Sequence, residues 1–169
     1  MTTLTLPATT YGELVKHLGQ GPEEQVAFLY GDAGNKSEEL SANELYRVPP
    51  EGFVGQSSHH LALADDVRGE VISRAWEYGG ALIEAHSHPG AREAEFSPTD
   101  LIGFEEWVPH VRWRLQGASY IALVFAGNDF DALVWAGESN DPAPLRRLRT
   151  GDRDLQPSNL TFESSSGER

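Results

Sequence analysis

Two histidines and an aspartate form the most chemically informative pattern in the sequence. His86 and His88 are separated by one residue and followed at once by Pro89, and Asp100 comes later in the setting Ser-Pro-Thr-Asp. Alternate residues of a β-strand face the same way, so both imidazoles would project from one face near a strand end. Two histidine nitrogens and a carboxylate oxygen suit Zn²⁺, which keeps a fourth position for water in catalytic sites. The pattern therefore predicts a metal site with His86, His88 and Asp100 as ligands.

Each half of this pattern also has a purely structural interpretation. Ser97 and Asp100 match a helix start, with Ser97 as N-cap, Pro98 at the first helical position and an acid at the third. Taken alone, Asp100 is more often a capping residue than a ligand, and an isolated His-x-His is more often a polar surface pair. The two halves together, separated by a short loop, favour the metal site.

The combined motif resembles that of a known family. "HSHP" at 86–89 followed by "SPTD" at 97–100 is similar to the signature of the JAMM zinc metalloproteases of the JAB/MPN group, and the resemblance covers most of residues 9–137. The usual pattern has six residues between the proline and the serine, whereas this chain has seven, at 90–96. The extra residue lies between the two halves of the motif, so it changes the loop at the substrate edge and need not disturb either ligand pair.

The resemblance implies zinc-dependent hydrolysis of an amide or isopeptide bond, with Zn²⁺ as the cofactor. It also implies a glutamate near the start of the first core strand, which takes a proton from water and passes it to the leaving amine. Glu23 and Glu24 both fit, and the spacing to the following Gln-Val-Ala-Phe-Leu favours Glu24. Ser97 is expected to hydrogen-bond the oxyanion or the attacking water. Glu84, two residues before His86, could orient a ligand or serve as a structural polar residue.

The substrate that the resemblance implies is the C-terminal tail of a ubiquitin-like protein, or its conjugates. Such a tail binds as an extended strand at a sheet edge, and we expect residues 40–55 to shape that groove. Stand-alone prokaryotic members are thought to process or deconjugate these proteins, with E1-like or E2-like proteins of the same pathway as further partners. The preference for peptide or isopeptide bonds stays open.

Three other functions remain as alternatives. A non-catalytic MPN scaffold would lack the site residues, which are all present here. A RadC-like relative associated with DNA would carry basic patches, and the sequence shows none. A metallohydrolase of small molecules with a similar site is compatible with the sequence.

Composition bounds the class of protein. The 169 residues include 26 acidic and 13 basic ones, a formal net charge of −13, which argues against a nucleic-acid partner. The absence of cysteine excludes disulfides and thiolate metal ligands. The sequence has no signal-peptide pattern at its N-terminus and no apolar run long enough to span a membrane, so we expect a cytoplasmic protein.

The elements that would position the site indicate an α+β fold. The resemblance implies a fold of the MPN/JAMM type, in which a mixed, cytidine deaminase-like sheet is flanked by helices. Strands are predicted at 3–6, 23–31, 40–48, 59–64, 81–88, 119–127 and 130–137. Helices are predicted to start near Thr9 or Thr10, near Asp65 or Asp66, and at Ser97, with Val15, Trp76 and Ile102 on apolar faces and Pro109 ending or kinking the last. Residues 49–58 are predicted to form a loop.

The expected domain organisation is simple. Residues 1–140 form the catalytic domain, and residues 141–169 form a C-terminal tail. The last dozen residues, which end in "ESSSGER", are expected to be disordered.

Overall fold

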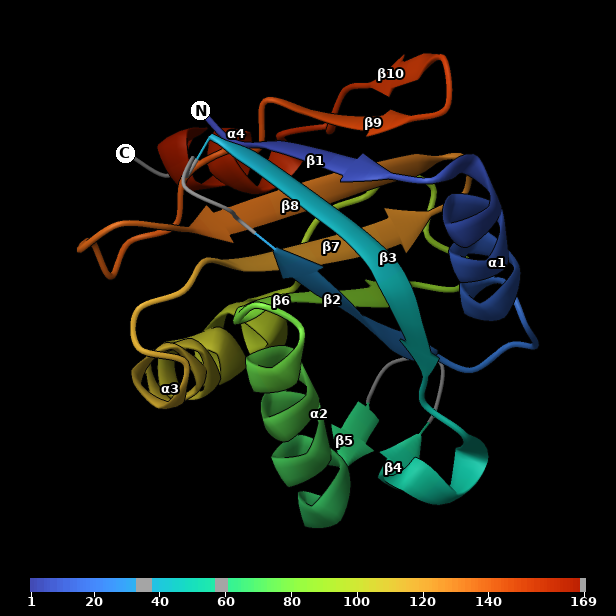
Figure 1. Cartoon of the computed structure of the whole chain (residues 1–169). Helices are drawn as coiled ribbons and strands as arrows, with labels where there is room; N and C mark the ends of the chain where they lie inside the picture. Colours follow the sequence, from blue (N-terminus) through green and yellow to red (C-terminus); the bar gives the residue numbers. More distant parts are fainter. Residues whose placement is uncertain (33–37, 57–60, 168–169) are drawn as a thin grey trace.

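The computed structural model shows an α+β fold built on one curled, mixed sheet (Figure 1). The structure describes residues 1–32, 38–56 and 61–167. In chain order the elements are β1 (Thr3–Leu6), α1 (Ala8–Leu18), β2 (Val26–Asp32), β3 (Glu39–Arg47), the short 3₁₀ helix η1 (Pro50–Gly52), β4 (Phe53–Gln56), β5 (Leu61–Leu63), α2 (Asp65–Glu77), β6 (Ala81–Ser87), α3 (Pro98–Arg114), β7 (Tyr120–Ala126), β8 (Asp129–Trp135), β9 (Arg147–Thr150), β10 (Arg153–Leu155) and α4 (Leu160–Gly167). The predicted fold class is confirmed.

The main sheet has eight strands in the order β10-β9-β1-β3-β2-β6-β7-β8. Strand β6, which carries the His-x-His motif, lies inside the sheet, antiparallel to β2 and parallel to β7. Strands buried on both faces read as continuous apolar runs, and β7 is such a strand, with the sequence YIALVFA. A central strand paired along both edges gives the site a rigid base.

Helices cover both faces of this sheet. On one face, residues of α2 and α3 such as Val71 and Val108 pack against Phe28 of β2. On the other face, Leu14 and Leu18 of α1 pack against Leu29 of the same strand. These side chains are buried almost completely, and such apolar burial is the main driving force for this arrangement.

The helix starts differ in part from those predicted. Ser97 is the N-cap of α3, as predicted. Helix α1 begins at Ala8 after Pro7, and α2 begins at Asp65 after Ala64; within the described residues neither N-cap makes a side-chain capping bond. The predicted caps at Thr9 or Thr10 and at Asp65 or Asp66 are therefore wrong.

Pro109 lies inside α3, which continues to Arg114. Of the two predicted effects of Pro109, ending the helix is wrong, and kinking it stays a prediction. Three apolar side chains predicted to face the core are exposed instead: Val15 (41%), Trp76 (55%) and Ile102 (65%). Each one is adjacent in sequence to a buried or partly buried position, so the helical rotation turns it away from the sheet.

The polypeptide after residue 141 is folded where the structure describes it. Strand β9 pairs parallel with β1, and β10 pairs antiparallel with β9. Residues 160–167 form α4. The expectation that the last dozen residues are disordered is therefore wrong for residues up to 167.

The segment predicted as a loop at 49–58 contains η1 and β4. Strand β4 pairs antiparallel with β5 to form a separate two-stranded sheet. The predicted strand at 59–64 is found at 61–63, while its first two residues, His59 and His60, lie outside the described residues.

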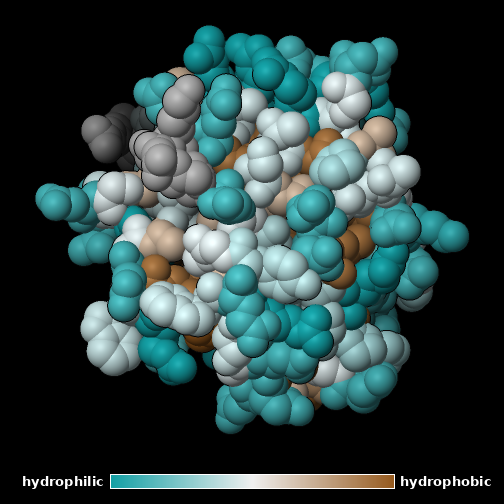
Figure 2. All heavy atoms as spheres, viewed as in Figure 1, coloured by the Kyte–Doolittle hydropathy of each residue, from teal (hydrophilic) through white to brown (hydrophobic). Residues whose placement is uncertain are grey.

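The face of the molecule that Figure 1 presents is mostly polar. Figure 2 shows that hydrophilic residues dominate this face and that apolar residues appear only in small, separate areas. None of the helices in the described part of the chain is long and apolar enough to cross a membrane.

Candidate metal centre

The three predicted ligands come from two elements that meet at one end of β6. His86 lies in β6 and is 4% exposed, with its ring packed against Phe96 at 5.8 Å. His88 directly follows the end of β6. Its backbone N–H donates a hydrogen bond of 2.9 Å to the carbonyl of Phe125, which lies in the neighbouring strand β7. Asp100 lies in the first turn of α3. The strand and the helix start therefore bring the ligands together, as the sequence predicted.

The ligand atoms converge closely. His86 Nε2 lies 3.2 Å from His88 Nε2 and 3.2 Å from Asp100 Oδ2, and His88 Nε2 lies 3.1 Å from the same oxygen. Ligand atoms around a tetrahedral zinc ion with bonds of about 2.0–2.1 Å are separated by about 3.3 Å. Two imidazole nitrogens and one carboxylate oxygen at these separations fit a metal ion with small adjustments. The group is compatible with a metal site.

Glu24 lies beside this group. Its Oε1 is 3.6 Å from His88 Nε2, and the residue is 6% exposed. Val26, two residues later, is the first residue of β2 and the partner of His86 in the β2–β6 pairing, so Glu24 lies just before the strand that pairs with β6. Glu23 is exposed. Of the two candidate glutamates, the structure brings Glu24 to the site.

Ser97 and Asp100 form a capping box. The backbone N–H of Asp100 donates to Ser97 Oγ at 3.0 Å, and the backbone N–H of Ser97 donates to Asp100 Oδ2 at 2.9 Å. The oxygen that caps the helix is thus the same oxygen that faces the two histidines. The structural interpretation of the Ser-Pro-Thr-Asp stretch as a helix start is confirmed, and the same stretch brings a carboxylate oxygen to the two histidines.

The electrostatics favour a cation at this point. Burial alone would raise the pKa of Asp100, but hydrogen bonds from His86 and His88 outweigh it and hold that pKa well below its usual range. Burial alone would lower the pKa of His86, but the hydrogen bond and the charge of Asp100, with Glu84 and Glu24, raise it above the ordinary value. The surrounding carboxylates therefore stabilise positive charge on the histidine side of the site.

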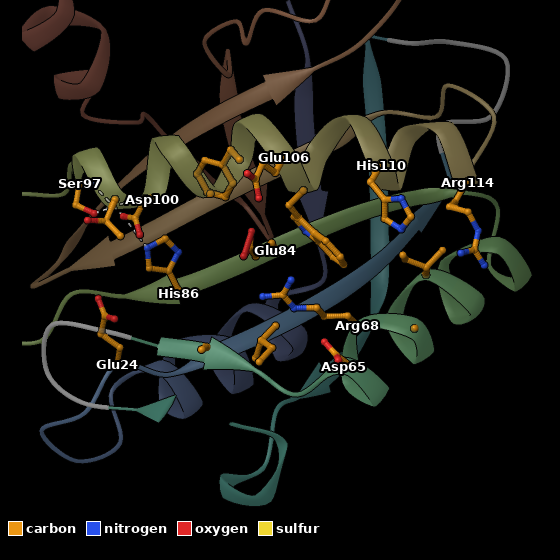
Figure 3. A pocket seen from close by; sticks show the side chains of 18 residues that line it. Glu24, Asp65, Arg68, Glu84, His86, Ser97, Asp100, Glu106, His110 and Arg114 are labelled. Atoms are coloured by element: carbon orange, nitrogen blue, oxygen red, sulfur yellow. Dashed lines mark hydrogen bonds and ion pairs between the residues drawn. The ribbon is translucent and has the colours of Figure 1, made fainter. Parts of the chain in front are cut away.

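A pocket of about 650 Å³ extends from the metal centre between α2, α3, β5 and β6. Figure 3 shows Glu24, His86, Ser97 and Asp100 at one end of it, and His110 and Arg114 at the other. Such a volume suits a ligand or a peptide segment. Ala62 and Leu63 of β5 contribute to its lining, and none of the described lining residues comes from residues 40–55. The expectation that residues 40–55 shape a substrate groove stays a prediction.

Glu84 lies in the middle of this pocket (Figure 3). Its Oε2 accepts a hydrogen bond from the Tyr120 hydroxyl at 2.9 Å, and that hydroxyl accepts one from Trp107 Nε1 at 2.8 Å. Burial raises the pKa of the Glu84 carboxyl. This chain of bonds gives Glu84 a structural role that links β6, β7 and α3.

Ser87, the middle residue of the His-Ser-His stretch, has a role that the sequence did not reveal. Its Oγ accepts from the backbone N–H of Gln25 at 3.0 Å, and its own N–H donates to the Gln25 carbonyl at 3.1 Å. These two hydrogen bonds hold Gln25, the residue after Glu24, against Ser87, the residue between the two histidines. A small hydroxyl residue between two ligands was the only signal available in the sequence.

The fold and the site define an α+β domain with a candidate His-His-Asp metal centre. Comparison with known proteins agrees: residues 7–136 match the family described as prokaryotic homologs of the JAB domain. The chain therefore belongs to this family. The resemblance to the JAMM group is confirmed at this level.

Two further comparisons add little. A solution structure of a protein from Desulfitobacterium hafniense aligns with 18% sequence identity and a TM-score of 0.49, covering 89% of this chain and 94% of that one. No curated protein matches the sequence.

Proposed function

We propose that this protein is a zinc metallopeptidase that hydrolyses the amide bond after the C-terminal tail of a ubiquitin-like protein, in processing or in deconjugation. The observation that carries the proposal is the position of Glu24. The nearly buried carboxylate of Glu24, with Oε1 3.6 Å from His88 Nε2, lies beside the three candidate ligands and is not one of them. A purely structural metal site has no need of such a carboxylate, whereas hydrolysis needs a base within reach of water.

His86, His88 and Asp100 would hold the ion through the three converging atoms described above. When bound, Zn²⁺ acts as a Lewis acid that lowers the pKa of water and polarises a carbonyl group. The chain contains no cysteine, so its donors are imidazole and carboxylate groups. Such a donor set with a position left for water is typical of catalytic rather than structural zinc.

Glu24 is the proton carrier in this proposal. Its carboxylate accepts a proton from the attacking water as the water oxygen bonds to the carbonyl carbon. The same carboxyl group then donates the proton to the amide nitrogen as the C–N bond breaks. Burial beside the site keeps this carboxyl close to the reacting groups.

In this proposal Ser97 stabilises the oxyanion. Its Oγ already accepts from the backbone N–H of Asp100, so the hydroxyl hydrogen is left to donate. A donor of this kind contributes most where negative charge develops in the transition state, on the order of a few kcal/mol.

The proposed tail lies extended in the pocket that leaves the metal centre. Ala62 and Leu63 of β5 form one side of that pocket. Within the described residues, β5 pairs only with β4, so its other edge can add an extended peptide through backbone hydrogen bonds.

The decisive experiment uses two adjacent glutamates as a matched pair. The zinc-loaded protein is incubated with a ubiquitin-like protein that carries a C-terminal extension, and products are measured by mass spectrometry. We expect cleavage after the tail, an about 100- to 10,000-fold loss of rate in Glu24→Gln, and the wild-type rate in Glu23→Gln. Full activity of Glu24→Gln, or no cleavage by zinc-loaded wild type, would contradict the proposal.

A further inference from the structure

A buried aspartate lies in the same row of the sheet as the first histidine ligand. His86 of β6 pairs with Val124 of β7, and Val124 pairs with Asp131 of β8. Residues in one row of adjacent strands face the same side, and Val124 belongs to the core beneath α2 and α3. Asp131 therefore occupies a core position on the same face as the metal centre, with 0% exposure.

Asp131 is satisfied by the C-terminal segment. Its Oδ1 accepts from the backbone N–H of Asn159 at 3.1 Å, and its Oδ2 accepts from the backbone N–H of Thr161 at 3.0 Å. The Thr161 hydroxyl donates to Oδ2 as well, at 2.6 Å. A buried carboxylate is costly unless it is hydrogen-bonded in this way, so Asp131 fixes the start of α4 against the sheet.

Thr161 also binds the loop before Ser97. The Thr161 Oγ1 atom that donates to Asp131 also accepts from the backbone N–H of Phe96 at 3.0 Å. Thr161 is 5% exposed and Phe96 is 3% exposed, and the Phe96 ring lies 5.8 Å from the His86 ring. One hydroxyl thus connects the core of the sheet to the residue that directly precedes Ser97.

Two more hydrogen bonds join the same segments. Ser158 Oγ donates to the carbonyl of Ala94 at 2.6 Å, and Ser164 Oγ donates to Glu95 Oε2 at 2.6 Å. Residues 94–96 belong to the seven-residue loop that is one residue longer than the usual motif. The C-terminal segment that holds this loop, residues 158–164, lies outside the family match at 7–136.

We propose that Thr161, anchored by Asp131, is a positioning residue for the metal centre, and that it holds the start of α3 in place so that Asp100 meets His86 and His88. The longer loop has more conformational freedom than the usual one, and the C-terminal segment removes that freedom. Outer contacts that orient ligands typically change metal affinity by about 10- to 100-fold when lost. This inference rests on the metal centre of the proposed function and is independent of its substrate.

The test measures metal binding. The metal-free protein is titrated with Co²⁺, and the affinity and the visible absorption of bound Co²⁺ are recorded. We expect Thr161→Val, which keeps the side-chain shape and removes the hydroxyl, to bind Co²⁺ about tenfold more weakly, with an altered spectrum. The variant Thr161→Ser keeps the hydroxyl, so its Co²⁺ affinity and its spectrum are expected to be close to those of the wild type.

A control on the same helix separates positioning from stability. Ser166 Oγ donates to the Phe162 carbonyl and touches no residue of the loop among the described contacts, so Ser166→Ala is expected to keep wild-type affinity. If Thr161→Val does not fold, Ser158→Ala, which removes the bond to Ala94, decides by the same readout. Wild-type affinity and spectrum in Thr161→Val, or in Ser158→Ala where the first variant does not fold, would overturn the inference. A wild-type protein that binds Co²⁺ and cleaves nothing would refute the proposed substrate and leave the inference intact.

Discussion

Asp100 and Ser97 exchange two hydrogen bonds at the start of α3, and the same Asp100 oxygen lies 3.2 Å from His86 Nε2. Helix capping and ligand placement therefore depend on one pair of side chains. We therefore expect a change that breaks the cap to move the Asp100 carboxylate relative to His86 and His88.

The first prediction concerns Ser97. In Ser97→Ala the N-cap acceptor is lost, so we expect the free energy of unfolding of the metal-free protein to fall by about 1 kcal/mol. The proposed oxyanion donor is lost as well, so we expect kcat for the fusion substrate to fall by about 100-fold or more. Urea unfolding and steady-state kinetics measure the two effects. A loss of stability with unchanged kcat would remove Ser97 from the catalytic role.

The second prediction concerns the ligands. We expect His88→Ala to lower Zn²⁺ affinity by more than the about 10- to 100-fold that outer contacts cause, because a donor atom is removed. His110, exposed at the far end of the pocket, supplies the control His110→Ala, which should retain wild-type affinity. Competition with a chelator measures both. Equal zinc retention in the two variants would be incompatible with the metal centre.

The third prediction is a pH dependence of metal binding. In the metal-free protein, burial lowers the pKa of His86, but Asp100, Glu84 and Glu24 outweigh it and raise that pKa above its ordinary value. Protons therefore compete with the metal at neutral pH, and binding releases them. We expect the Kd for Co²⁺ to rise as the pH falls from about 8 to about 6, measured by titration at each pH. A Kd that stays constant over this range would contradict the electrostatic account.

The fourth prediction tests the Glu84–Tyr120–Trp107 chain. Tyr120→Phe would leave the Trp107 N–H and the Glu84 carboxyl without their shared partner. We expect this to lower the free energy of unfolding by about 1–3 kcal/mol. Tyr11, a half-buried tyrosine with no hydroxyl hydrogen bond among those that the described residues make, gives the control Tyr11→Phe. Urea unfolding that shows the same change in both variants would argue against a role for the chain of bonds.

The fifth prediction concerns His17, which is buried in α1 and hydrogen-bonded through Nε2 to the Val26 carbonyl at 2.9 Å. Burial lowers the pKa of His17, opposed in part by that hydrogen bond. The unfolded chain therefore binds a proton more readily than the native protein, so the stability contributed by neutral His17 is present above about pH 6.5 and declines as the pH falls below it.

Substitution of His17 tests this sign. We expect the stability of His17→Gln to depend less on pH than that of wild type between about pH 7.5 and pH 5.5, measured by urea unfolding at each pH. Lys16→Gln, a change at the exposed neighbouring position, should leave the wild-type dependence in place. A steeper dependence in His17→Gln would reverse the assigned sign.

The convergence of His86, His88 and Asp100 could be predicted from the sequence because its signals are local. The strand period places His86 and His88 on one side, and the cap signature places Ser97 and Asp100 at a helix start. The position of Glu24 could not be predicted from local signals. It depends on the pairing of β2 with β6, which brings together residues about 60 positions apart. Resemblance to the JAMM family, not spacing alone, supplied that step.

The incorrect predictions concern residues whose environment is set by distant parts of the chain. Trp76 and Ile102 are exposed although they lie near the apolar stripe of their helices, because the sheet covers only part of each helix surface. The Ser-rich segment after residue 157 has a composition typical of disorder, and its order depends on Asp131, a partner 30 residues away from Thr161. The sequence around a buried carboxylate in a core strand does not indicate which distant segment will donate hydrogen bonds to it.

The pairing of β1 with β9 joins residues 3–6 to residues 147–150. A ribosome makes β1 before β9, so one edge of β1 stays uncovered until β9 has been synthesised. The hydrogen bonds between residues 94–96 and residues 158–164 form later still. If Thr161 acts as proposed, a nascent chain carries His86, His88 and Asp100 before it can hold them in their final arrangement.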